Sequence, residues 1–93
     1  MNLPLLPRIL HEDRDFCVLD KPAGCLSVPG RNGQGLPVLS DWLESDEKSP
    51  LRGQKAWVVH RLDRDTTGVI LFARNAEAHR RACMAFENSG TNA

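Results

Sequence analysis

The 93-residue sequence lacks a long apolar run, a secretory leader and a net charge. No apolar run approaches the roughly 20 residues that a membrane helix needs, so a membrane-spanning helix is not expected. The first ten residues have no basic region, and prolines interrupt their short apolar stretch, unlike a signal peptide. The sequence therefore predicts a cytoplasmic protein without a membrane partner.

Paired-cysteine motifs are also missing. Cys17, Cys25 and Cys83 are an odd number of cysteines and show no C-x-x-C spacing. This usage is typical of small buried thiols in a reduced compartment. No pair among the cysteines and histidines has the spacing of a zinc finger, so no metal site is expected.

The charges balance to zero over the whole sequence, but their distribution is uneven. Acidic residues gather between positions 41 and 47, and basic residues outnumber acidic ones between positions 52 and 81. A locally basic half is compatible with a phosphate-bearing partner, and equally with a solvated mixed surface. Charge alone therefore leaves a phosphate-bearing partner open.

Short apolar runs separated by turn residues indicate strands at 16–19, 26–28, 56–62 and 69–73. Apolar residues at helical spacing predict a short helix over 37–44, with Pro37 in its first turn. A second helix is expected after Asn75, which would cap it. The order strand, strand, helix, strand, strand, helix predicts an α+β fold. No linker divides the sequence, so residues 1–93 should form one domain, with a disordered polar tail at 88–93.

The stretch HRLDRDTTG concentrates charge between two apolar runs. On a strand end, Arg61 and Asp63 would share one face. The guanidinium would favour the ionised carboxylate, which is useful as a nucleophile or a base. A structural ion pair beside an Arg64–Asp65 turn explains the same spacing, so spacing alone leaves both interpretations open.

HRLDRDTTG resembles the HRLDxxTSG signature of the RluA-type pseudouridine synthase family, with Thr67 in place of serine. Upstream, DKPAGCLSVPGR resembles the segment that precedes this signature in the family, with Cys25 at a position often held by a larger apolar residue. The two motifs occur in the family's order, and the resemblance extends from about Ile9 to Asn88. It implies the N-terminal half of the synthase fold, a partial mixed or antiparallel sheet with short helices.

The resemblance implies an enzyme that isomerises uridine in ribosomal or transfer RNA to pseudouridine, with no cofactor and no metal. Asp63 matches the family's catalytic aspartate, acting either as a nucleophile at C1′ or as a base at C2′. Arg61 matches the arginine that occupies the space left by the flipped nucleotide and pairs with the aspartate. Extruding a base costs a few kcal/mol of stacking, and a planar cation in the gap offsets part of that cost.

Other residues of the two motifs have supporting roles in this interpretation. Candidate phosphate contacts are Lys21, Arg31 and Arg64. Residues expected to shape the turn after the aspartate are Thr66, Thr67 and Gly68. His60 should face away from Asp63 and serve as a packed, hydrogen-bonded support. Trp42 and Trp57 sit in apolar patterns and are expected in the core.

The family's active-site tyrosine lies in a strand beyond the second helix, and this sequence contains no tyrosine. Residues 1–93 are therefore expected to form a single incomplete domain, the N-terminal portion of the catalytic domain, that is inactive alone. The alternative is a remnant that binds RNA or a protein partner without catalysis. An incomplete sheet exposes a strand edge, so self-association through that edge is expected.

Overall fold

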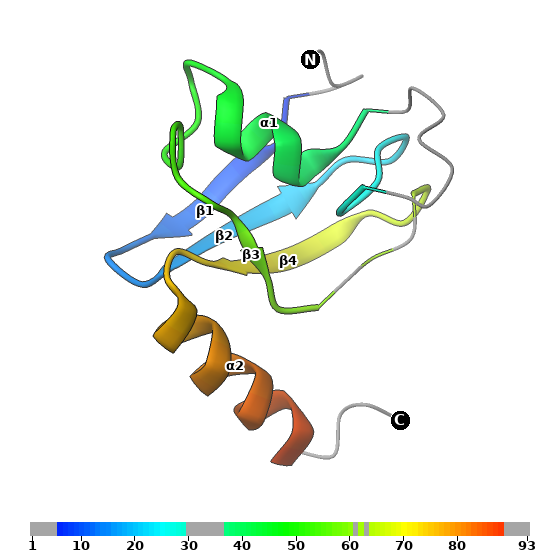
Figure 1. Cartoon of the computed structure of the whole chain (residues 1–93). Coiled ribbons are helices and arrows are strands. Elements are labelled where there is room, and N and C mark those ends of the chain that lie inside the picture. The colour runs from blue at the N-terminus through cyan, green and yellow to red at the C-terminus, as the bar shows by residue number, and fades with distance from the viewer. Residues whose placement is uncertain (1–5, 30–36, 61, 63, 89–93) are drawn as a thin grey trace.

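The computed structural model describes residues 6–29, 37–60, 62 and 64–88 (Figure 1). The predictions made for Arg31, Arg61, Asp63 and the tail from 89 onwards lie outside the described residues. The elements are β1 (Arg8–Glu12), β2 (Phe16–Lys21), α1 (Leu39–Ser45), β3 (Trp57–Val58), β4 (Gly68–Ala73) and α2 (Ala76–Asn88). This combination confirms the predicted α+β class.

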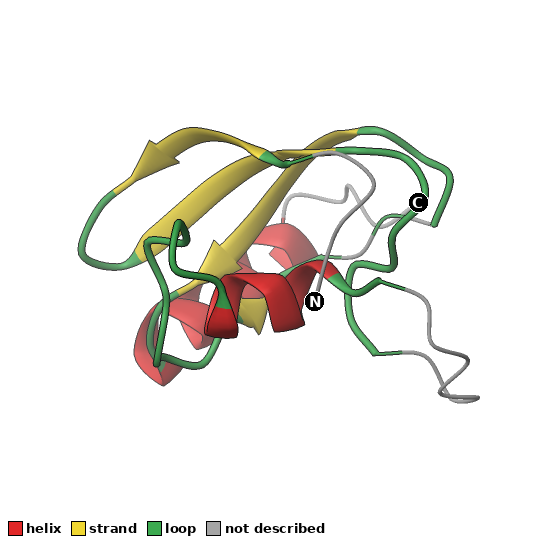
Figure 2. Cartoon of the chain, turned by 90° about the horizontal axis from the view of Figure 1, so that it is seen from above, coloured by secondary structure: helices red, strands yellow, loops and turns green. Residues whose placement is uncertain are grey.

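The strands form one antiparallel sheet in the order β1-β2-β4-β3. The central strands β2 and β4 pair along their full lengths, from Phe16 opposite Ala73 to Lys21 opposite Gly68. The short helix α1 lies against one face of this sheet (Figure 2). The sheet register therefore sets the end of β2 directly beside the start of β4.

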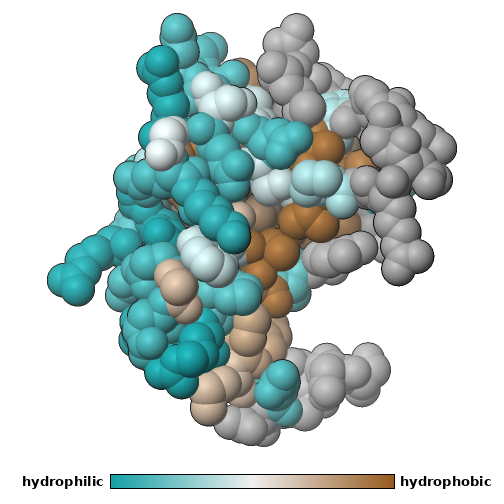
Figure 3. Space-filling model, in the orientation of Figure 1, coloured by the Kyte–Doolittle hydropathy of each residue, from teal (hydrophilic) through white to brown (hydrophobic). Residues whose placement is uncertain are grey.

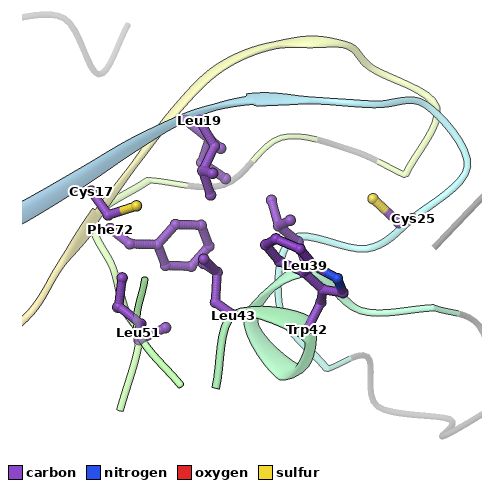
Figure 4. Packing of buried hydrophobic residues seen from close by; sticks show 10 residues of the cluster. Cys17, Leu19, Cys25, Leu39, Trp42, Leu43, Leu51 and Phe72 are labelled. Atoms are coloured by element: carbon purple, nitrogen blue, oxygen red, sulfur yellow. The ribbon is translucent and has the colours of Figure 1, made fainter. Parts of the chain in front are cut away.

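The core lies between α1 and the sheet (Figure 4). Alternate side chains of the central strands point into it and are fully buried: Cys17, Leu19, Ile70 and Phe72. The facing side chains of α1 follow helical spacing and are also buried: Leu39, Trp42 and Leu43. Trp42 thus belongs to the core as predicted, because its ring completes the apolar side of the helix.

The N-terminus of α1 has no side-chain cap at Val38. Backbone carbonyls supply the acceptors instead, since Leu39 N–H donates to Leu26 O at 2.7 Å and Ser40 N–H donates to Ser27 O at 3.2 Å. These bonds satisfy groups that a helix leaves unpaired in its first turn. The helix consequently begins at Leu39, two residues later than predicted.

Two predicted strands need correction, and one strand was missed. The stretch 26–28 forms only an isolated parallel bridge between Leu26 and Val38. β1 was not predicted, because its residues are mostly exposed and show no apolar alternation. β3 covers two residues instead of 56–62. Leu71 is the next residue of β4 that would pair with β3. β3 ends early because the backbone N–H of Leu71 donates to the side chain of His60 at 3.2 Å.

The helix α2 begins as predicted, since Asn75 Oδ1 accepts a hydrogen bond from Ala78 N–H at 2.8 Å. Its first turns contact β3 and β4, and Ala78 and Ala82 are buried there. Figure 3 shows apolar surface where α2 meets the rest of the molecule. Phe86, near the C-terminal end of α2, is 39% exposed. Asn88 is the last residue of α2, which corrects the predicted start of the tail.

Candidate functional site

The two sequence motifs meet in space. We call residues 59–67, which join β3 to β4, the motif loop, and residues 22–29, which follow β2, the upstream segment. Gly24 N–H donates to Arg64 O at 2.9 Å. The hydroxyl of Ser27 donates to Leu62 O at 2.7 Å. The upstream segment therefore binds the motif loop on both sides of position 63 in the sequence.

Lys21, the last residue of β2, is the centre of this arrangement. Its side chain is 1% exposed, and Nζ donates to Pro22 O at 3.1 Å, Arg64 O at 2.9 Å and Thr66 O at 3.0 Å. An ammonium group has three donors, and all of them are used. The prediction that Lys21 contacts an RNA phosphate is therefore corrected: the side chain is enclosed and binds the motif loop.

Ser27 was not singled out from the sequence. Its side chain donates to Leu62 O and accepts from Leu62 N–H at 3.0 Å, so one hydroxyl satisfies both backbone groups of that residue. Ser27 is 3% exposed. The available signal was a lone small polar residue between the apolar residues Leu26 and Val28.

The end of the motif loop depends on glycine. Gly68 has φ +143°, in a region that side chains other than glycine rarely adopt, and it begins β4 opposite Lys21. Thr66 contributes its carbonyl oxygen to the ammonium of Lys21. Thr67 is exposed. The turn-shaping role of Thr66, Thr67 and Gly68 stays a prediction.

Arg64 and Asp65 form the tip of the motif loop and pair with each other. The guanidinium donates to the two carboxylate oxygens at 3.2 and 3.0 Å. The hydrogen bond from Arg64 lowers the pKa of Asp65. Both side chains are exposed, and exposed ion pairs constrain a structure weakly. Arg64 is therefore accessible to an incoming phosphate, and its predicted phosphate contact stays a prediction.

His60 is a packed support, as interpreted from the sequence. Its Nε2 accepts the backbone N–H of Leu71, and its ring lies 5.3 Å from the ring of Phe86 between centroids. An accepting Nε2 carries no proton, so the neutral ring has its hydrogen on Nδ1. Burial lowers the pKa of His60, which favours this neutral form.

Within the described residues, no group of three or more His, Cys, Asp or Glu side chains is placed to hold a metal ion. Cys17 and Cys25 are buried free thiols, and burial raises the pKa of Cys17 to about 11. Trp57 is only half-buried, with the ammonium of Lys55 3.9 Å from its ring centroid. No helix in the described part of the chain has the length and apolar character to cross a membrane.

Comparison with known proteins gives consistent matches. Residues 15–92, which include both motifs, match the family described as RNA pseudouridylate synthase. An uncharacterized RNA pseudouridine synthase of Zymomonas mobilis is 44% identical over 87 residues, covering 90% of this chain and 37% of that protein. The dual-specificity RNA pseudouridine synthase RluA of Vibrio vulnificus is 42% identical over 72 residues, covering 75% of this chain and 26% of that protein.

A solved structure has a similar fold. Human RNA pseudouridylate synthase domain containing 4 superposes with a TM-score of 0.61 at 23% identity, over 87% of this chain and 30% of the human chain. The present chain is shorter than the proteins it matches: it spans 37% of the Zymomonas mobilis protein and 20% of a Nitrosomonas europaea relative.

The buried ammonium of Lys21 makes a prediction for stability. Replacing Lys21→Met keeps most of the apolar stem but removes the three donors, so the free energy of unfolding should fall by about 2–3 kcal/mol. Urea denaturation measures this change. Lys48→Met, at an exposed lysine, is the control and should change stability by less than about 0.5 kcal/mol. Equal stability of the two variants would contradict the role given to Lys21.

His60 makes a prediction for pH dependence. Because its pKa is lowered from 6.5 in the folded state, the unfolded chain binds a proton that the folded chain does not. Stability should therefore be complete above the unfolded pKa and fall as pH drops from there towards the folded pKa. In His60→Gln, whose amide oxygen can accept the Leu71 N–H, this decrease should be smaller. Thermal denaturation of both proteins between pH 5 and 8 tests it, and parallel curves below pH 6.5 would contradict it.

Proposed function

The chain belongs to the RluA-type RNA pseudouridylate synthase family, and on this basis we propose that it forms the N-terminal portion of a catalytic domain that converts uridine in RNA to pseudouridine. The proposed substrate is ribosomal or transfer RNA. Relatives named as a ribosomal large subunit pseudouridine synthase and as a tRNA pseudouridine synthase support this class of substrate. The proposed compartment is the cytoplasm, where buried free thiols such as Cys17 and Cys25 persist.

The proposed reaction is an isomerisation and needs no other reactant. The bond from N1 of uracil to C1′ of ribose breaks, the uracil turns, and C5 bonds to C1′. C5 then loses its hydrogen as a proton, and N1 gains one. Asp63 is the proposed catalyst, as a nucleophile at C1′ or as a base at C2′. Arg61 is proposed to occupy the gap left by the extruded nucleotide.

One observation carries this proposal: the upstream segment binds the backbone on both sides of Asp63 in the sequence. Lys21 and Gly24 both bond to Arg64 O, and Ser27 bonds to Leu62. A single carboxylate is useful in catalysis only when its position is fixed relative to the reacting carbon. Hydrogen bonds from the upstream segment therefore hold the motif loop. A solvated turn with a salt bridge would not need them.

Arg31 and Arg64 are proposed as phosphate contacts, because guanidinium groups bind phosphate through two parallel hydrogen bonds. Arg64 already makes such a pair with the carboxylate of Asp65. With a phosphate in place of that exposed carboxylate, the guanidinium of Arg64 would donate its two hydrogen bonds in the same geometry. A non-catalytic RNA-binding remnant would use the same contacts, so a test of function has to detect bond breaking.

The proposal predicts activity that depends on Asp63. We define an assembled synthase as residues 1–93 followed by the part of the Zymomonas mobilis relative that comes after its matching segment. It should release tritium from RNA that contains 5-tritiated uridine. Asp63→Asn should lower the rate by about 10³-fold, since it removes the proposed nucleophile or base. Residues 1–93 alone are expected to release none.

Asp65→Asn is the matched control for this assay, because Asp65 is a neighbouring carboxylate that is exposed and paired with Arg64. It should retain activity within a few-fold of the unaltered protein. Release that survives Asp63→Asn would refute the proposed catalyst. RNA binding that weakens with salt but produces no tritium would instead identify a non-catalytic remnant.

We also propose that the chain self-associates through the outer side of β4. β3 pairs only with Phe72 and Ala73, so the start of β4 has a paired strand on one side alone within the described residues. Val69 in this part is 58% exposed. Unpaired strand edges bind other strands, and a lysine on the edge opposes this.

Sedimentation velocity over a range of concentrations should therefore show dimers or larger species for the unaltered chain. Val69→Lys should shift the distribution to monomer. Met84→Lys changes an exposed apolar residue of α2 in the same way but leaves the edge intact, so it should still associate. A monomeric unaltered chain at all concentrations would overturn this prediction.

A further inference from the structure

Ser27 connects the helix α1 to the motif loop. On one side, its backbone carbonyl accepts a hydrogen bond from Ser40 N–H in the first turn of α1, at 3.2 Å. On the other side, its hydroxyl donates to Leu62 O at 2.7 Å and accepts from Leu62 N–H at 3.0 Å. Ser27 is 3% exposed, so water does not compete freely for these hydrogen bonds.

The helix side of this connection is rigid. Leu39 and Leu43 of α1 are fully buried in the core, and Ser40 is 5% exposed. Leu26, the neighbour of Ser27, adds two further backbone bonds, to Pro37 O at 2.9 Å and from Leu39 N–H at 2.7 Å. The position of the Ser27 hydroxyl is therefore set by the packing of α1 against the sheet.

The loop side of the connection adjoins the proposed catalyst. Leu62 is covalently bonded to Asp63, and Arg64 on its other side is held independently by Lys21 and Gly24. On the N-terminal side of position 63 in the sequence, Ser27 satisfies both backbone polar groups of Leu62.

We propose that Ser27 is a positioning residue for Asp63, which it fixes through the backbone of Leu62. This inference rests on the proposed function, because it assumes that Asp63 is the catalyst. Rates of reaction are sensitive to placement, and a displacement of about 1 Å lowers a rate by about 10²-fold. Loss of the Ser27 hydroxyl should therefore reduce the rate of the chemical step more than it reduces RNA binding or stability.

The chain contains a matched control for this proposal. Ser49 is 8% exposed, and its hydroxyl donates to Leu43 O and accepts from Leu51 N–H at 3.1 Å. The chemistry is that of Ser27: one buried hydroxyl donates to a backbone carbonyl and accepts from a backbone N–H. The bonds of Ser49 lie between α1 and the loop before β3 and do not involve the motif loop. Ser49→Ala therefore reproduces the structural loss without the proposed loss of positioning.

The first experiment uses residues 1–93 and does not depend on activity. Amide hydrogen exchange followed by NMR should show that Ser27→Ala lowers the protection of the Leu62 amide about tenfold, the effect expected for one lost hydrogen bond. Ser49→Ala should lower protection at Leu51 and leave Leu62 unchanged. Unchanged protection at Leu62 in Ser27→Ala, or an equal loss there in both variants, would overturn the proposal.

The second experiment measures kcat and KM of the assembled synthase by tritium release. Ser27→Ala should lower kcat about 10-fold to 10²-fold with KM changed less than about threefold. Ser27→Thr, which keeps the hydroxyl, should recover most of the rate, and Ser49→Ala should retain a kcat within about twofold. If Ser27→Ala does not fold, Ser27→Cys, which keeps the size but bonds weakly, takes its place.

The two experiments separate failure of this inference from failure of the proposed function. A kcat of Ser27→Ala equal to that of Ser49→Ala refutes positioning by Ser27 while leaving Asp63 as the catalyst. An unaltered assembled synthase that releases no tritium contradicts the proposed function. In that case hydrogen exchange at Leu62 still decides whether Ser27 holds the backbone next to Asp63.

Discussion

The arrangement of the site depends on one buried cation. The ammonium group of Lys21 lies at the end of β2, enclosed by protein, and desolvation of an ammonium ion costs several kcal/mol unless its donors are satisfied. Backbone carbonyls of Pro22, Arg64 and Thr66 provide the acceptors. Since two of these carbonyls belong to the motif loop, the need to satisfy Lys21 also specifies where that loop lies. Burial of a lysine usually destabilises a protein. Here the three acceptors that Lys21 requires favour one backbone conformation of the motif loop.

Packing of the apolar core also constrains the position of the motif loop. α1 packs on the sheet through Leu39, Trp42 and Leu43, and its first turn uses carbonyls of the upstream segment instead of a side-chain cap. These backbone bonds hold the upstream segment against the helix. The hydroxyl of Ser27 in turn holds the backbone of Leu62. Core packing, helix capping and loop geometry are therefore successive steps of one chain of contacts that ends beside position 63.

The sequence predicted those elements whose apolar pattern reflects burial. β2, β4 and α2 are recognisable because alternate or helically spaced residues enter the core. β1 has mostly exposed residues, so it carries no such pattern. β3 was predicted too long, because periodicity cannot show that the side chain of His60 replaces a backbone partner of Leu71. Propensity rules describe neighbours along the chain, and these bonds depend on tertiary position.

The site was predictable only in part, for the same reason. The motif resemblance indicates Asp63 and Arg61, which lie outside the described residues. It does not show what the remaining polar residues do. Lysine is rarely buried, so a lysine next to a turn was expected to be solvated and free to bind phosphate. Ser27 has no distinctive spacing at all. Both roles arise only when residues far apart in the sequence are brought together.

The positive charge in the second half of the sequence is largely balanced by neighbouring carboxylates in the part of the chain that the structure describes. The second half of the sequence is locally basic, but acidic side chains lie beside its arginines. Arg64 pairs with Asp65, Arg74 with Glu12, Arg80 with Glu77, and Arg81 with Asp15 and Glu77. Pairs such as Arg64–Asp65 are exposed, and exposed ion pairs are held weakly. The hydrogen bonds of Lys21 and Ser27 that hold Arg64 and Leu62 are buried, so salt screens them far less than these surface pairs.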